Sequence, residues 1–326
     1  MKAGAVWALS IVFTLIAAGV LFERIGQRRD RERYARVGRA VDIGGRTLNI
    51  YCSGEGQPAV VLQTFSHMSG YAWSALEPRV AEFTRACWYD RAGYGWSDPG
   101  PSDHTMKATA TDLHALLDAA GVELPVVMLG TGDAASEIRV YHGMYPNEVA
   151  GAVFMNGNGV EDGQAIPESA RGPWAKLGIF AAGARGAACL AFPVIADLGG
   201  LRLANVLGGP RRTPALDFPP EQQAELDFLS DNPEAQRGGN MCPRAEDMQQ
   251  VRSSGNLGDL PLIVLAARSN YGAADAGAWN KHQAEVVQPG LAALSTRGRL
   301  VFEDHRANTA DVVEALREVA GDVRRH

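Results

Sequence analysis

Residues 126–137, VVMLGTGDAASE, decide the fold of this chain. The first four residues form a continuous apolar run, which is typical of a buried strand. Gly130 and Gly132 interrupt that run, and Ala134 and Ala135 then begin a segment with helical spacing that continues to Tyr145. The stretch therefore predicts a buried strand, a tight turn of small residues and a helix, in that order.

The turn in this stretch has the spacing of a nucleophile elbow. In the pattern G-x-S-x-G, a sharp strand-to-helix turn presents a serine at the edge of the sheet. Here small residues occupy the flanking positions, Gly130 and Ala134, while Gly132 stands at the serine position. Glycine tolerates the strained backbone of such a turn but has no side chain that could attack a carbonyl. We expect the turn to be kept and its reactive group to be absent.

Strands and helices alternate on both sides of this turn. Gly44 and Gly45 predict a hairpin within 39–51, since paired glycines favour a tight turn between short strands. The spacing of apolar residues predicts strands over 59–63, 85–89, 149–155, 260–266 and 299–302, and helices over 71–83, 106–120, 279–294 and 310–323. This alternation indicates an α/β fold whose mostly parallel sheet is covered by helices on both faces.

The alternation stops between residue 157 and about residue 256. Stretches rich in Ala, Leu and Gly predict short helices joined by loops over 174–190, 193–207, 221–229 and 244–251. We interpret about 158–256 as an inserted helical lid. Its apolar residues fit either the lining of a pocket for a small apolar ligand or a simple cover for the sheet edge.

The N-terminal segment is long and apolar enough to cross a bilayer. Residues 3–22 contain only Ser10 and Thr14 as polar side chains, and a 20-residue helix spans the ~30 Å hydrocarbon core. We therefore expect a transmembrane anchor over 1–23. A cleaved signal peptide is the competing interpretation, which the single N-terminal cation, Lys2, and the lack of an A-x-A site disfavour.

An arginine-rich segment follows the anchor. Residues 24–38 are too charged for a core, and we interpret them as a juxtamembrane linker or an amphipathic extension near anionic lipid. The remaining chain, 39–326, forms the globular domain. Because the arginines after the span outnumber the one lysine before it, the positive-inside rule places this domain on the cytoplasmic side of the membrane.

Composition limits the classes of partner. The chain has 326 residues, of which 46% are hydrophobic and 21% charged, as expected for a globular protein with a core. The net charge of -6, without a basic cluster beyond the N-terminal region, gives no reason to expect nucleic acid as a partner. We expect the lipid bilayer as a partner through the N-terminal helix, and the sequence gives no oligomeric state.

The cysteines suggest neither a metal nor a redox motif. Cys52, Cys87, Cys189 and Cys242 are widely spaced and form no CxxC pattern, so we interpret them as small buried residues, with their disulfide status open. We expect no cofactor and no metal site.

One longer motif indicates a family. Residues 89–98, YDRAGYGWSD, resemble a signature of the α/β-hydrolase superfamily, in particular its bacterial membrane-anchored esterase-like branch. The resemblance continues through 125–151, including Arg139 and the Tyr145-Pro146 pair, and is weaker over 260–319. It implies a serine, acid and histidine triad in that chain order, and an oxyanion hole formed partly by a glycine-rich loop after an early strand.

The chain departs from that family pattern at several positions. The register of the resemblance places Gly132 at the nucleophile and Asn270 at the acid, and an amide does not stabilise an imidazolium as a carboxylate does. Asn156 stands where relatives carry aspartate, and Asp275 is the nearest remaining carboxylate. His305 alone keeps its triad position.

The oxyanion loop differs as well. Its counterpart is Phe65-Ser66-His67-Met68, whose bulk would hinder the close backbone approach that an oxyanion hole requires. We expect Phe65, His67 and Thr131 to contact a ligand. A metal site built from His67, His305 and Asp133 is not favoured, because these residues are far apart in the sequence.

Asp133 and the Asp90-Arg91 pair have two interpretations each. Asp133 could be a carboxylate nucleophile, but a helix-capping role near the positive end of the helix dipole is favoured. Asp90 and Arg91 could be catalytic, but a structural network that holds the turn is favoured.

The leading hypothesis is therefore a membrane-anchored pseudoenzyme that binds a small apolar ligand or a partner. One alternative is an active hydrolase of ester-like substrates that uses Asp133 as its nucleophile. The other is a structural or assembly protein.

Overall fold

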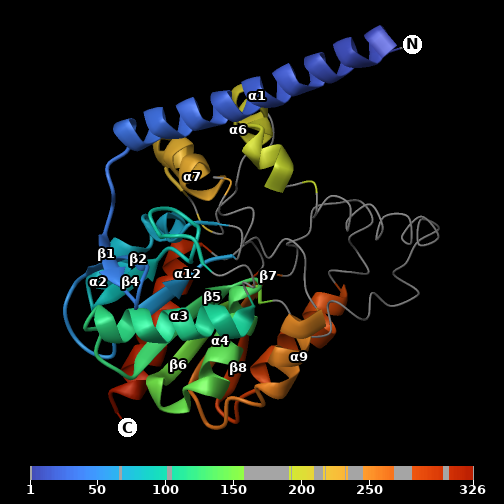
Figure 1. Ribbon diagram of the computed structural model, residues 1–326. Coiled ribbons are helices and arrows are strands. Elements are labelled where there is room, and N and C mark those ends of the chain that lie inside the picture. Colours follow the sequence, from blue (N-terminus) through green and yellow to red (C-terminus); the bar gives the residue numbers. More distant parts are fainter. Residues whose placement is uncertain are drawn as a thin grey trace.

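In a computed structural model of the chain, eight strands form one sheet in the order β1-β2-β4-β3-β5-β6-β7-β8 (Figure 1). The structure describes residues 2–65, 68–100, 105–157, 191, 193–208, 216, 218–231, 233, 245–267, 281–303 and 308–325. The strands are β1 (Arg39–Asp42), β2 (Thr47–Ser53), β3 (Val60–Gln63), β4 (Ala86–Tyr89), β5 (Val126–Thr131), β6 (Val149–Met155), β7 (Leu262–Ala267) and β8 (Gly298–Glu303). Strand β2 pairs antiparallel with β1 and β4, and the other pairs are parallel.

Helices cover both faces of this sheet, as the alternation predicts. One core joins the sheet to α3 (Met106–Ala119), α4 (Ala134–Met144) and α11 (Gln288–Ala292). The other joins it to α2 (Glu77–Ala81) and α12 (Thr309–Val323). Successive side chains of a strand point to opposite faces, so Val127 contributes to one core and Met128 to the other.

Two expected helices differ in detail. The helix expected over 71–83 is divided into a 3-10 turn, η1 (Gly70–Trp73), and α2. Pro78 lies in the first turn of α2, where no intrahelical hydrogen bond is lost through its missing N–H. The same proline prevents one regular α-helix from running through this position, because its ring clashes with the preceding turn. The helix expected over 279–294 is a π-helical segment, η5 (Gln283–Val287), followed by α11, and residues 279–280 lie outside the described part of the chain.

The N-terminal segment forms one unbroken helix, α1 (Lys2–Arg33). The arginine-rich residues expected to form a linker are therefore helical as far as Arg33. Residues 6–33 contain an 18-residue window of mean hydropathy 2.1 that is 6% buried, so the helix is a candidate membrane span by length and composition. Beyond α1, Tyr34 stacks on Phe228 with ring centroids 5.6 Å apart.

Three helices of the insertion between β6 and β7 are described. They are α6 (Gly200–Val206), α7 (Gln223–Ser230) and α9 (Ala245–Ser253), besides the residues of a helical turn at 193–197. Helices α6 and α7 contact α1, whereas α9 contacts α3 and α4 at the opposite side of the insertion. Much of 158–256, the expected lid, lies outside the described residues, and its role as a lid stays a prediction.

Cys52 and Cys87 are joined by a disulfide bond. The two residues are direct partners in the register of β2 and β4. The bond answers the question of disulfide status that the sequence left open for these two residues, because strand pairing brings together two cysteines that are 35 positions apart in the sequence. Cys189 and Cys242 lie outside the described residues.

Candidate functional site

The turn after β5 has the backbone of an elbow. Gly132 follows the last residue of β5, adopts φ +59°, and donates its N–H to the Met155 carbonyl at 3.3 Å. Gly130 permits the close approach of β5 to α4, since a Cβ there would lie 2.6 Å from the Ile138 Cδ1 and 2.9 Å from the Ala134 carbonyl carbon. Gly130 is thus required by the close approach of β5 to α4, and Gly132 adopts a left-handed conformation that glycine permits without strain.

The aromatic ring of Phe65 occupies the space that a side chain at the elbow apex would need. A Cβ on Gly132 would lie 2.2 Å from Cε1 and 2.5 Å from Cδ1 of that ring. Phe65 comes from the loop after β3, the counterpart of the oxyanion loop. A serine at residue 132 would therefore meet both this ring and a backbone conformation that side chains rarely adopt.

Arg91 fixes the Phe65 loop relative to helix α4. Its guanidinium donates to the carbonyls of Thr64 at 2.6 Å and Phe65 at 2.9 Å. The same group donates from Nε and Nη2 to Oε2 of Glu137, at 3.0 and 2.6 Å. One buried cation thus joins the end of β3 to the first turn of α4, and holds Phe65 over Gly132.

Glu137 is a residue that the sequence analysis missed. Its side chain is 2% exposed, and burial raises the pKa of its carboxyl to about 7, although Arg91 acts in the opposite direction. A carboxylate on a helical face made otherwise of small and apolar residues signals a buried cationic partner. That signal was present in the spacing of Glu137, Ile138 and Tyr141, but the identity of the partner was not.

Asp90 is the centre of a buried network next to Arg91. Its carboxylate accepts hydrogen bonds from Ser69 Oγ, from the Gly70 N–H at 3.0 Å and from Asn49 Nδ2 at 3.0 Å. The Trp96 N–H donates to it as well, at 3.2 Å. A carboxylate with four donors is a structural tie, which supports the structural interpretation of Asp90.

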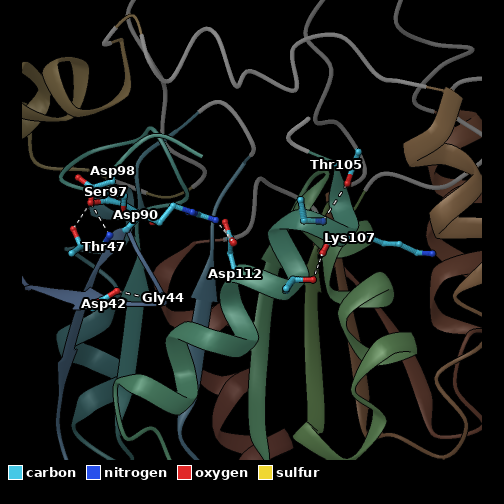
Figure 2. A network of polar contacts seen from close by, with 12 residues as sticks. Asp42, Gly44, Thr47, Asp90, Ser97, Asp98, Thr105, Lys107 and Asp112 are labelled. Atoms are coloured by element: carbon cyan, nitrogen blue, oxygen red, sulfur yellow. Dashed lines mark hydrogen bonds and ion pairs between the residues drawn. The ribbon is translucent and has the colours of Figure 1, made fainter. Parts of the chain in front are cut away.

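The loop after β4 is tied to β2 by further polar contacts. Ser97 Oγ donates to the Asp90 carbonyl at 2.6 Å. Figure 2 shows Asp98 beside Thr47. Asp98 Oδ2 accepts from the Thr47 N–H at 2.7 Å and from its hydroxyl at 2.9 Å. These hydrogen bonds lower the pKa of Asp98. The signature stretch thus shapes a loop beside the site.

Asp133 does not cap α4 with its side chain. In the described turn its backbone is helical, with φ -70° and ψ -21°, and its carboxylate makes no capping hydrogen bond. The capping hydrogen bond that the sequence favoured is therefore not formed, because a capping side chain needs extended backbone to reach the free N–H groups. Asp133 does occupy the N-cap position of α4, and its interaction with the helix dipole stays a prediction. The carboxylate instead acts by its charge on Arg91 and Glu137.

Only some of the other expected site residues lie within the described part of the chain. Thr131 ends β5 and is buried, while His67, Asn270, Asp275 and His305 lie outside the described residues. The parallel strands β7 and β8, which precede Asn270 and His305, end at the same edge of the sheet as β5. The carboxyl ends of β7 and β8 therefore lie on the elbow's side of the sheet.

Asn156 has a structural partner. It follows β6 with φ +46°, a left-handed conformation that asparagine tolerates better than most residues. Its Oδ1 accepts from the Ala267 N–H at 2.9 Å, so the side chain extends the pairing of β6 with β7 beyond the strand ends.

A cavity of about 240 Å³ lies apart from the elbow, between α1, α6 and α7. Most of the residues that line it are polar or charged, among them Glu23, Asp30 and Arg202, while Val206 and Phe228 contribute apolar surface. This is not the apolar pocket expected beside Gly132.

Comparison with known proteins supports the fold. The structure is similar to an alpha/beta hydrolase fold protein from Burkholderia ambifaria, with a TM-score of 0.60 and 17% identity over 89% of this chain and 98% of that one. An esterase from Thermogutta terrifontis gives 0.56 and 15%, over 89% and 97%. A bromoperoxidase from Bacillus anthracis gives 0.57 and 14%, over 88% and 99%. The protein therefore has the α/β-hydrolase fold.

Sequence relatives are more distant. The uncharacterized protein YbdG of Bacillus subtilis is 23% identical over 158 residues, which are 45% of this chain and 49% of that protein. The probable transporter efuK of Hormonema carpetanum is 27% identical over 124 residues, 36% of this chain and 18% of that protein. The matched part of this chain thus spans about half or less of either relative. No family model matches the chain.

Proposed function

We propose that this protein is a non-catalytic α/β-hydrolase-fold protein, anchored in a membrane by α1, that binds a small apolar ligand or a partner. One observation carries the proposal. The apex of the elbow is Gly132, and the Phe65 ring fills the space in which a nucleophilic side chain would stand. The site has thus been closed sterically as well as deprived of its nucleophile.

The energetic argument against ordinary serine hydrolysis is strong. Removing the nucleophile of a serine triad costs on the order of 10⁶ in turnover, and the remaining members do not compensate because they act as a unit. The hydrogen bonds of Arg91 are a second argument against hydrolysis, since they orient the carbonyl groups of Thr64 and Phe65 toward its guanidinium. We expect the same loop to be a poor oxyanion hole.

The proposed ligand class is based on the fold and on the proteins with similar structures. An esterase is among the similar structures, and pockets in this fold lie at the carboxyl edge of the sheet. We therefore propose an ester-like or acyl small molecule as the ligand class, bound at the edge that carries Gly132.

Hydrolysis is tested first on the full chain in detergent. We expect no labelling by a fluorophosphonate probe and no turnover of p-nitrophenyl acetate above that of His305→Ala. Gly132→Ser alone should remain inactive, because Phe65 stays in place. Robust turnover by the wild type that is lost in His305→Ala would contradict the proposal.

The enzyme alternative uses Asp133 as nucleophile. It predicts that Asp133→Asn abolishes turnover with little change in melting temperature, whereas our proposal predicts no turnover in either protein. The observed placement disfavours this alternative, since the charge of Asp133 acts on the buried pair of Arg91 and Glu137.

The assembly alternative is separated by ligand binding. A panel of acyl esters and lipids should raise the melting temperature of the full chain, because a ligand that binds only the folded state stabilises it. No shift with any member of the panel would favour a structural or assembly role.

Two observations give opposite indications of the membrane side. The arginines of α1 favour a cytoplasmic domain by the positive-inside rule. The Cys52–Cys87 disulfide favours an oxidising compartment. Labelling of a cysteine placed at Glu314, in a variant whose Cys189 and Cys242 are serine, by a membrane-impermeant maleimide on intact cells decides between them. Labelling means an external domain.

A further inference from the structure

Helix α6 has its polar and apolar side chains reversed relative to a helix that faces water. Both of its polar side chains, Arg202 and Asn205, are bonded to the protein, with Asn205 Nδ2 3.1 Å from Asp231 Oδ2. The large side chains that it turns outward are apolar, and Leu203, Val206 and Leu207 just after the helix are 49%, 72% and 76% exposed. Such an arrangement is unfavourable in water.

The preceding helical turn continues this apolar surface. Val194 and Ile195 are 55% and 43% exposed. We call these five residues, Val194, Ile195, Leu203, Val206 and Leu207, the α6 apolar face.

An ion-pair cluster fixes α6 to α1. Arg202 Nε donates to Glu23 Oε2 at 3.0 Å, and its Nη1 donates to Asp30 Oδ2 at 2.5 Å. Glu23 is only 5% exposed. The side chains of Arg202 and Asp30 are each 21% exposed, so the cluster is partly buried. Because Arg202 is paired with two carboxylates that lie two turns apart on α1, the cluster holds α6 in one position along that helix.

Glycines allow the two segments to touch closely. A Cβ on Gly19 would lie 2.8 Å from the Leu198 carbonyl oxygen, and one on Gly26 would lie 2.3 Å from Arg202 Nε. On the other side, a Cβ on Gly199 would lie 2.7 Å from the ring of Phe22. The backbone of α1 therefore lies in close contact with Leu198 and Arg202, and this contact centres on residues 19–26 of α1.

This contact lies where α1 changes character. Phe22 is the last residue of the apolar run and Glu23 is the first charged residue after that run. A helix rises 1.5 Å per residue, so the seven residues of α6 extend only about 10 Å from this boundary. If α1 spans a bilayer, α6 must lie near the level of the lipid headgroups.

We propose that the α6 apolar face lies in the headgroup and acyl boundary of a bilayer that contains anionic lipid, as a second membrane contact beside α1. The proposal rests on membrane anchoring by α1. Two observations identify the bilayer as the occupant. The face is fixed to the lipid-exposed helix itself, whose side chains from Val6 to Phe22 are largely exposed. The arginines at 24, 28, 29, 31 and 33 supply charge that complements anionic headgroups.

The contact is tested by nitroxide-lipid quenching of the full chain in liposomes of phosphatidylcholine and phosphatidylglycerol. In a background of Cys189→Ser and Cys242→Ser, an NBD fluorophore is attached to Val206→Cys. Val12→Cys, 53% exposed on α1, serves as the anchor control. Glu314→Cys on α12, with a side chain 75% exposed, serves as the water-facing control.

We expect shallow nitroxide lipids to quench the label at 206 about twofold or more relative to the label at 314, as for an interfacial helix. Quenching at 12 together with a label at 206 that behaves as the one at 314 would overturn the inference and leave the anchor intact. Absence of quenching at both 12 and 206 would overturn membrane anchoring itself, and the inference with it.

A charge variant gives an independent readout. Leu207→Glu should reduce quenching of the label at 206, because a carboxylate leaves the apolar boundary, while Glu318→Gln, on α12, should not. Equal quenching in Leu207→Glu and its parent would contradict the bilayer contact.

Discussion

The apex of the elbow and the polar network beside it differ in whether they carry polar side chains. At the apex, Gly132 has no side chain and the Phe65 ring fills the gap. In the network, Asp90 and Arg91 are buried and accept or donate several hydrogen bonds each. The two regions are adjacent, since the Arg91 guanidinium donates to the carbonyl of Phe65 itself.

The difference shows that the architecture of the site is separable from its chemistry. Buried charges must be paired or they destabilise the fold, so the residues around Arg91 are constrained by folding alone. The apex carries no buried charge that must be paired, and the aromatic ring of Phe65 fills it instead. A fold can therefore keep the framework of a catalytic turn without the reaction.

The largest expected effect is the loss of one partner from the buried ion pair. Arg91→Met should lower the free energy of unfolding by about 3 to 5 kcal/mol, because it leaves Glu137 buried and unpaired. Urea denaturation of the full chain in detergent measures this. The double variant Arg91→Met/Glu137→Met should recover most of the loss, and a single variant as stable as the wild type would show that the network does not support the turn.

The second largest effect is expected from the Cys52–Cys87 disulfide, which joins β2 to β4. In the chain-entropy model, a bond that closes 35 residues stabilises the fold by about 4 kcal/mol. We expect Cys52→Ser/Cys87→Ser to lose about 2 to 4 kcal/mol in the same assay. Dithiothreitol should lower the melting temperature of the wild type and not that of the double variant. Equal sensitivity of both proteins would mean that this bond contributes nothing.

Filling the apex should cost less. Gly132→Ser introduces both a clash with Phe65 and strain at positive φ, for which we expect a loss of about 1 to 3 kcal/mol. In a double-mutant cycle with Phe65→Ala, the two changes should couple by about 0.5 kcal/mol or more, because the smaller side chain makes room for the serine. Additive effects would show that the ring does not occupy the apex.

The smallest effect is expected at the rim of the network. The pKa of Asp98 is lowered by hydrogen bonds from Thr47, so its contribution to stability is present above its unfolded pKa and is lost as the pH falls. Asp98→Asn should lower stability at pH 7 by less than about 1 kcal/mol, since the group is largely exposed. The difference from the wild type should shrink as the pH falls through the lowered pKa of Asp98 in the folded protein, and a constant difference would assign it to another cause.

Much of the fold could be predicted from local patterns. The alternation of strands and helices, the turn at 130–134 and the long apolar helix follow from spacing and composition, which depend only on neighbours along the chain. The division of the expected helix at Pro78 was missed because the apolar spacing continues across it.

The site was predictable only in part. Gly132 and the bulk of Phe65 were visible in the sequence, but the sequence did not give the packing of that ring on the apex. The pairing of Arg91 with Glu137, and of Arg202 with Glu23, joins residues 46 and 179 positions apart. Such partners are not encoded in spacing.

By itself, the sequence determined the order of the elements and the absence of a nucleophile at residue 132, because periodicity and the identity of a side chain are local properties. Only the tertiary structure decided that Phe65 fills the space at the apex, that the Asp133 side chain makes no capping hydrogen bond, that Cys52 meets Cys87, and that α6 is fixed to α1. Each of these depends on which surfaces meet when the sheet forms, and that is set by packing and burial over the whole chain.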